Sequence, residues 1–143
     1  MNKTTAPPTG ITDLDALLAG MSPILHPALY VFVTLAPAAP PYTGPFQLRF
    51  QEAEGETLVI KQDDAEAAGF ASIYPCRMIT LRIASSLEAV GFLAVVTTHL
   101  AAAGIGVNPV SAYHHDHLFI SPGDAQKAME VLHALSRGTN APN

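Results

Sequence analysis

Charged residues are scarce in this chain. Asp, Glu, Lys and Arg together make up 13% of its 143 residues, whereas an ordinary soluble domain contains roughly 25%. Hydrophobic residues make up 49%, so a chain of this length forms one compact unit or two small subdomains that share a core. So few charges predict that part of the surface is buried against a partner.

Basic residues are the scarcer kind of charge. Seven Lys and Arg residues stand against twelve Asp and Glu residues, which leaves a net charge of -5. A protein that binds nucleic acid needs clustered cations to neutralise phosphates. The cations here are scattered singly, so we expect no nucleic-acid partner; they are Lys3, Arg49, Lys61, Arg77, Arg82, Lys127 and Arg137.

Cysteine occurs once, at Cys76. A single cysteine cannot form a disulfide or a cysteine-based zinc site within one chain, and a reducing compartment fits this usage. Because Cys76 follows a proline and precedes an apolar strand, we favour a buried, inert thiol over a nucleophile activated by a histidine.

Long apolar runs and nucleotide-binding motifs are also missing. The longest apolar region is interrupted by Glu88 and His99, and the N-terminal MNKTTAPPTG lacks the apolar part of a secretory signal. There is no Walker A loop, and Gly104-Ile105-Gly106 follows a predicted helix, the reverse of the order in a dinucleotide fingerprint. We therefore expect a cytoplasmic protein with no membrane partner, no cofactor and no enzymatic activity.

Helix starts are marked by a Ser, Thr or Asp with a carboxylate three residues later, a pattern that caps helix N-termini. It predicts a helix that starts near residue 12 and further helices over residues 65–68, 86–103 and 123–136. The capping pairs are Thr12 with Asp15, Asp63 with Glu66, Ser85 with Glu88, and Ser121 with Asp124. Apolar residues surround most of the 86–103 segment, which predicts a second contact, for instance with another subunit.

Strands are indicated by runs of branched and aromatic residues. We expect them at 29–35, 46–50, 57–61, 78–83, 105–113 and 117–120, with a proline-rich loop at 36–45. The second half of the chain then has the order βαββα, which is typical of the α+β, ferredoxin-like class, an antiparallel sheet with helices on one face.

The strand that carries Pro109 belongs at the edge of such a sheet, because proline has no ladder donor. One strand is missing from the second half, so either the first half of the chain supplies it or two incomplete sheets complement each other. We expect two subdomains, at residues 10–72 and 73–138.

Three histidines and an aspartate lie together at His114, His115, Asp116 and His117. In a continuous strand His115 and His117 would share one face, and His114 and Asp116 the other, so one face would offer too few ligands for zinc. If the chain reverses at 114–116, these residues form a polar hairpin tip. The hairpin tip is the favoured interpretation, with a metal site and a ligand contact as alternatives.

The predicted helix start at Ser85-Ser86 follows a strand and would lie next to the strand segment 106–108. Backbone N–H groups at a helix N-terminus favour an anion such as a carboxylate, and Asn108 could accept a hydrogen bond from an ammonium group. The alternative is that Ser85 only caps its helix and Asn108 only forms a turn before Pro109.

The run ITLRIASSLEAVGFLAVVTTHLAAAGIGVNPVSAYHHDHLFI resembles an ACT domain, and GFLA followed by LAAAGIGVN is similar to the regulatory domain of aspartate kinases. Residues 10–136 as a whole resemble a family of short, stand-alone ACT-like bacterial proteins of uncharacterised function. VSAYHHDHLFISPGDAQKAMEVL is more loosely similar to the arginine sensors of the CASTOR type.

The resemblance implies two ACT-like subdomains, a homodimer, and an amino-acid ligand between such domains. Carried over by position, the ligand residues are Ser86, Glu88, Gly91, Phe92, Leu93, Val107 and Asn108. Kinase domains often have aspartate at the position of Asn108, so this chain lacks that negative partner for the ligand's amine.

Three functions remain open at this point. The first is a non-enzymatic regulatory module that binds a small amino acid and thereby changes its association with a protein partner of unknown identity. The second is a structural interaction domain with no small-molecule ligand, in which Phe92 and Leu93 form a dimer core. The third is a metal-dependent enzyme that uses His114, His115, His117 and Asp116, for which one strand offers too few converging ligands.

Overall fold

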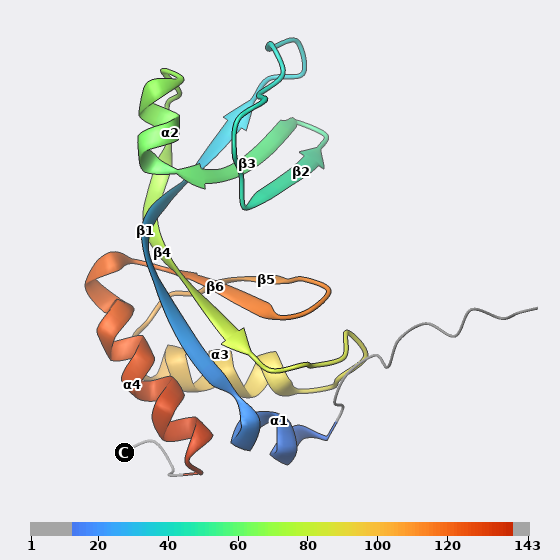
Figure 1. The fold of residues 1–143 in the computed structure, drawn as a ribbon, viewed down its shortest axis with the longest axis vertical. Helices are drawn as coiled ribbons and strands as arrows, with labels where there is room; N and C mark the ends of the chain where they lie inside the picture. Colours follow the sequence, from blue (N-terminus) through green and yellow to red (C-terminus); the bar gives the residue numbers. More distant parts are fainter. Residues whose placement is uncertain (1–12, 139–143) are drawn as a thin grey trace, which may run out of the picture.

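The computed structural model describes residues 13–138, which form one antiparallel sheet of six strands with helices packed on it (Figure 1). The strand order is β2-β3-β1-β4-β6-β5. The elements are α1 (Leu14–Gly20), β1 (Ser22–Leu35), β2 (Leu48–Glu52), β3 (Gly55–Lys61), α2 (Gln62–Ala67), β4 (Ile73–Arg82), α3 (Phe92–Ala102), β5 (Asn108–Ser111), β6 (Asp116–Ile120), a 3-10 turn η1 (Pro122–Asp124) and α4 (Ala125–Ser136).

The two long strands β1 and β4 run through both halves of the molecule (Figure 1). The start of β1 pairs with the end of β4, with Leu25 opposite Ile79, and the end of β1 pairs with β3. The strand missing from the second half is therefore supplied by the first half of the same chain. The short strand β5, which contains Pro109, lies at the sheet edge as predicted.

Strand β1 is longer than the predicted 29–35 because a bulge accommodates its second proline. Pairing with β4 is interrupted between Leu25 and Leu29, and Pro27 lies in this interruption, where no ladder hydrogen bond is needed. The Arg77 guanidinium donates two hydrogen bonds, of 3.1 and 3.0 Å, to the His26 carbonyl oxygen. The His26 carbonyl oxygen in the bulge therefore has hydrogen-bond donors.

The helices cover one face of the sheet and bury the larger part of the core there. Side chains of α1, α3 and α4 pack with those of β4 and β6, and Ala65 of α2 packs on β1 and β3. The most enclosed members are Leu17, Ile79, Leu81, Val96, Leu100, Leu118, Ile120 and Leu132. This arrangement confirms the predicted α+β, ferredoxin-like fold with helices on one face.

The opposite face carries no helix among the described residues and is closed by aromatic side chains instead. Phe119 makes edge contacts with Tyr30 and Phe32, at ring centroid distances of 6.2 and 5.8 Å. Cys76 is fully buried in this cluster, and its thiol donates to the Tyr30 carbonyl oxygen at 3.4 Å. The predicted burial of the thiol is confirmed, and this burial raises the pKa of Cys76 to about 11, which disfavours the reactive thiolate.

Some of the predicted helices start near the expected residue, but most are not capped by the side chain that the sequence pattern indicated. Asp13 caps α1, accepting from the Ala16 N–H at 2.8 Å, whereas Thr12 lies outside the described residues. Helix α2 begins at Gln62, before the expected cap, and neither it nor η1 has a side-chain cap. The largest error is α3, which begins at Phe92 and not at Ser86.

The error at α3 has a local cause. The Ser86 hydroxyl oxygen accepts a hydrogen bond from the Glu88 N–H at 3.0 Å, and the Ala89 N–H donates to the Ser86 carbonyl. Serine can make the same short-range bonds in a turn as at a helix start. Residues 83–91 therefore form a loop.

No helix within residues 13–138 combines the length and the hydrophobicity needed to cross a bilayer.

Candidate ligand-binding hollow

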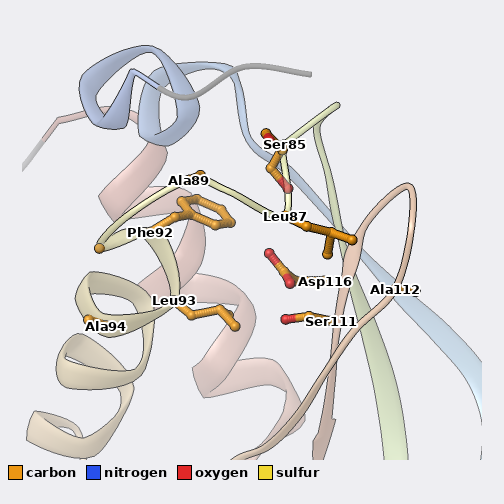
Figure 2. A pocket seen from close by; sticks show the side chains of 11 residues that line it. Ser85, Leu87, Ala89, Phe92, Leu93, Ala94, Ser111, Ala112 and Asp116 are labelled. Carbon is orange, nitrogen blue, oxygen red and sulfur yellow. The ribbon is translucent and has the colours of Figure 1, made fainter. Parts of the chain in front are cut away.

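A small hollow of about 150 Å³ lies at the end of the sheet where the 83–91 loop and the N-terminus of α3 face the β5–β6 hairpin (Figure 2). Its volume is below the roughly 300–1,000 Å³ of pockets for drug-sized ligands, so it suits a smaller molecule. The lining residues are Ser85, Ser86, Leu87, Ala89, Gly91, Phe92, Leu93, Ala94, Ser111, Ala112 and Asp116.

Helix α3 begins at this hollow without a side-chain cap. Its N-cap residue is Gly91, whose φ of 92° is in the left-handed region that favours glycine. The first intrahelical hydrogen bond runs from the Val95 N–H to the Gly91 carbonyl, at 3.0 Å. The N–H groups of Phe92, Leu93 and Ala94 therefore have no intrahelical acceptor. Together with the helix dipole they favour an anion.

Asp116 is the acidic residue of the hollow. It is the first residue of β6 and pairs with Ser111 of β5, and it is only 8% exposed. Within residues 13–138 its carboxylate makes no hydrogen bond and no salt bridge. Figure 2 shows its side chain in the space between Leu87, Leu93 and Ser111. None of the described lining residues is basic. The hollow is therefore lined by the Asp116 carboxylate and by the N-terminus of α3.

The residues carried over from the resemblance divide into two groups. Ser86, Gly91, Phe92 and Leu93 line the hollow, while Glu88, Val107 and Asn108 are not among its lining residues. Asn108 pairs with Phe119, which belongs to the aromatic cluster on the helix-free face. Paired residues of neighbouring strands project to the same face. The Asn108 side chain is therefore on the face opposite to the hollow.

The expected meeting of the 85–86 segment with residues 106–108 is wrong for a topological reason. Strands β4 and β5 both run antiparallel to β6, so they are parallel to each other. A loop that follows β4 then lies beside the end of β5 and not beside its start. In the register, Leu81 pairs with Asp116 and Asp116 pairs with Ser111, which brings the end of β5 to the loop.

The histidine cluster forms a hairpin, as favoured from the sequence, but the turn is earlier than expected. The Ala112 N–H donates to the His115 carbonyl at 3.0 Å, and His114 is exposed at the tip. Asp116 was assigned to this turn, and that assignment is wrong because it is buried in β6. Within residues 13–138 no group of three or more His, Cys, Asp or Glu side chains could hold a metal ion.

The other two histidines of the cluster connect neighbouring segments. His115 Nδ1 donates to the Ile83 carbonyl at 3.1 Å, linking the hairpin to the start of the loop. On the helix-free face the Thr80 hydroxyl lies 2.8 Å from His26 Nε2 and 2.9 Å from His117 Nδ1. Burial, and then the charges of His115 and His26, lower the pKa of His117, against the opposing effect of Asp116.

Sequence reasoning considered Asp116 only as part of the histidine cluster and did not place it in the amino-acid site. The signal was the alternation of β6, in which Asp116 shares a face with the buried core residues Leu118 and Ile120. An acidic residue on a core-facing position needs a partner or a ligand, because burying an uncompensated charge is costly.

Comparisons with known proteins place this architecture in a family. Two family models, both described as ACT domain, match residues 9–77 and 73–134. A protein of unknown function from Vibrio cholerae, described as a possible transport protein, is 36% identical, with a TM-score of 0.73 over 86% of this chain and 95% of that chain. The chain therefore belongs to the ACT-domain family.

More distant structures show the same fold. A protein from Agrobacterium tumefaciens is 19% identical, with a TM-score of 0.68, and covers 81% of this chain and 89% of its own. The regulatory subunit of aspartate kinase from Thermus thermophilus, in a ligand-free form, is 13% identical, with a TM-score of 0.60 over 79% of this chain and 95% of that one.

The chain is thus a tandem ACT-domain protein with the fold of aspartate kinase regulatory subunits. A search of curated proteins finds no match to it. The looser similarity to arginine sensors stays a prediction.

Proposed function

We propose that this protein is a non-enzymatic regulatory ACT module that binds a small amino acid in the hollow at the N-terminus of α3. The observation that carries the proposal is the uncapped helix start at Gly91, which leaves three N–H groups of α3 without an intrahelical acceptor in residues that line a hollow of about 150 Å³. They match the carboxylate of an amino acid. Ser86, Phe92 and Leu93 supply the remaining contacts.

The size of the hollow limits the ligand. Its volume of about 150 Å³ is below the roughly 300–1,000 Å³ of pockets for drug-sized ligands. That space holds an amino-acid backbone and a short side chain. Apolar walls from Leu87, Ala89 and Leu93 favour a side chain without charge.

We propose that the chain has no catalytic activity of its own and acts in the cytoplasm. Asp116 is the only acidic or basic residue among the described lining residues, and no hydrogen bond joins its carboxylate to Ser85, Ser86 or Ser111 as a base would be joined to a nucleophile. The single buried thiol suits a reducing compartment.

The two proposed subdomains, residues 10–72 and 73–138, share β1 and β4, and we propose that a homodimer completes the ligand site. Leu87 and Val90 lie on the loop that forms the wall of the hollow, and they are 67% and 84% exposed. Apolar side chains this exposed next to a site favour a covering subunit. Val90→Ser is expected to weaken self-association in sedimentation experiments, with Lys61→Ser, exposed in the other half, as the control.

The regulatory step would use the same loop. Residues of this loop, Leu87 among them, line the hollow, while Val90 is not a lining residue and is exposed. A ligand that orders this loop changes the surface that a second copy or a protein partner meets.

A thermal-shift screen of the twenty amino acids, each at 10 mM, tests the proposal. A ligand that binds only the folded state stabilises it by RT ln(1 + [L]/Kd), so at least one small amino acid is expected to raise the Tm, and calorimetry then gives its Kd. A flat screen together with concentration-dependent self-association would instead support the structural interaction domain.

A further inference from the structure

We propose that Asp116 is the subsite for the ligand's amine, so the hollow selects a free amino group as well as a carboxylate. This inference rests on the proposed function and names a residue that the resemblance did not assign to the amino-acid ligand. It replaces Asn108 as the group that meets the ammonium.

Burial and isolation of the carboxylate carry the inference. Asp116 is 8% exposed, and no donor or cation among residues 13–138 pairs with its carboxylate. Buried carboxylates in folded proteins are paired or hydrogen-bonded, because an uncompensated buried charge is destabilising. Among the described residues no fully enclosed side-chain oxygen lacks a hydrogen-bond partner, so the unpartnered carboxylate oxygens of Asp116 are accessible to a molecule in the hollow that this residue lines.

The geometry around Asp116 defines what would satisfy it. The residue lines the hollow together with the first residues of α3, and its ladder partner Ser111 lines the same hollow. A cation in this space would contact the carboxylate while a carboxylate of the same molecule contacted the helix N–H groups of Phe92 to Ala94. An α-amino acid carries these two opposite charges on groups attached to the same carbon atom.

The fixed placement of Asp116 makes it a specificity residue. It lies in a regular strand, paired with Leu81 on one side and with Ser111 on the other. A strand holds a side chain more rigidly than a loop does. The matched acid in which a hydroxyl replaces the amine would leave this carboxylate without a cation, so it would bind less tightly.

Three matched probes separate the two subsites. L-alanine carries both charges, L-alaninamide keeps the amine and loses the carboxylate, and L-lactate keeps the carboxylate and loses the amine. Each is titrated into the full-length ¹⁵N-labelled protein, and the amide signals of Asp116 and of Phe92 to Ala94 are followed. We expect L-alanine to bind at least tenfold more tightly than L-lactate, and L-alaninamide to move the Asp116 signal.

Asp116→Asn removes the charge with almost no change of shape, and Glu130→Gln, on an exposed position of α4, is the matched loss of one negative charge. The first variant is expected to lose at least tenfold in L-alanine affinity and the response to L-alaninamide, and the second to bind like the wild type.

The possible failures are distinguishable. Equal binding of L-alanine and L-lactate, with no response to L-alaninamide, would overturn the amine subsite and leave the proposed function standing. A response of Asp116 to L-alaninamide with no binding of any amino acid would support the subsite and overturn the proposed function. No response to any of the three probes, together with a flat screen of the twenty amino acids, would overturn both, and this readout does not depend on whether a variant folds.

Discussion

Ser111 and Asp116 are partners across the β5–β6 ladder, and both line the hollow at the N-terminus of α3. Asn108, at the start of the same strand, pairs with Phe119 on the opposite face. The register of one short hairpin therefore decides which polar residues of this segment reach a ligand.

This register predicts opposite results for two substitutions in β5. Ser111→Leu places a larger side chain in a hollow of about 150 Å³, and it is expected to weaken amino-acid binding by roughly tenfold or more, a loss of about 1.4 kcal/mol. Asn108→Ala is expected to leave the affinity unchanged, since its side chain is on the other face. Calorimetry measures both, and a larger loss from Asn108→Ala would restore the assignment made by resemblance.

Glycine at position 91 is predicted to stabilise the protein at the start of α3. Its φ of 92° is one that a residue with a Cβ rarely adopts, so Gly91→Ala is expected to cost about 1–2 kcal/mol. Gly106→Ala is the control, because a Cβ there meets no atom within 4 Å and its φ is not in the left-handed region. Its free energy of unfolding in urea is expected to stay within about 0.5 kcal/mol of the wild type. Equal losses in the two variants would contradict the left-handed cap.

The sharing of β1 and β4 predicts that the two subdomains unfold together. Phe119 contacts Tyr30 and Phe32 and is 2% exposed, so Phe119→Ala is expected to cost roughly 3–5 kcal/mol and to shift one single transition. Phe50→Ala, at a side chain that is 60% exposed, is expected to change stability by only about 0.5 kcal/mol. Calorimetry would show equal van't Hoff and calorimetric enthalpies, whereas two separate transitions would disprove the coupling.

His117 is predicted to make stability depend on pH. Its pKa in the folded state is lowered from the ordinary 6.5, mainly by burial. The unfolded chain therefore binds the proton more readily, and the free energy of unfolding falls as the pH drops below about 6.5.

The change is best measured as a difference between wild type and His117→Gln in urea unfolding at pH 7.5 and pH 5.5. The wild type is expected to lose more stability over this interval than the variant, which has no imidazole at this position. Parallel pH profiles would show that His117 does not titrate with folding.

Much of the fold follows from patterns that the sequence displays directly. Runs of branched and aromatic residues identify β4 and β6, Pro109 marks an edge strand, and the order of elements in the second half defines the ferredoxin-like class. These features depend on local propensity and on burial of one face, which a single sequence records.

The site was less predictable because it depends on tertiary register and on competing local bonds. Ser86 and Glu88 fit a helix cap but form a turn, so the helix starts at Phe92. Asp116 looked like a turn residue because aspartate suits a turn, and only its alternation with Leu118 and Ile120 indicates burial. The parallel relation of β4 and β5 was implied by the predicted topology, and it would have excluded Asn108.

The central claim is that a small amino acid binds with its carboxylate on the first N–H groups of α3. The most direct test is the ¹⁵N-HSQC titration of the wild-type protein with the amino acid that stabilises it most in the thermal-shift screen. The account predicts that the amide signals of Phe92, Leu93 and Ala94 shift together, with one saturating Kd and with the Asp116 signal. Saturable binding that leaves these four signals unchanged while others move would contradict it.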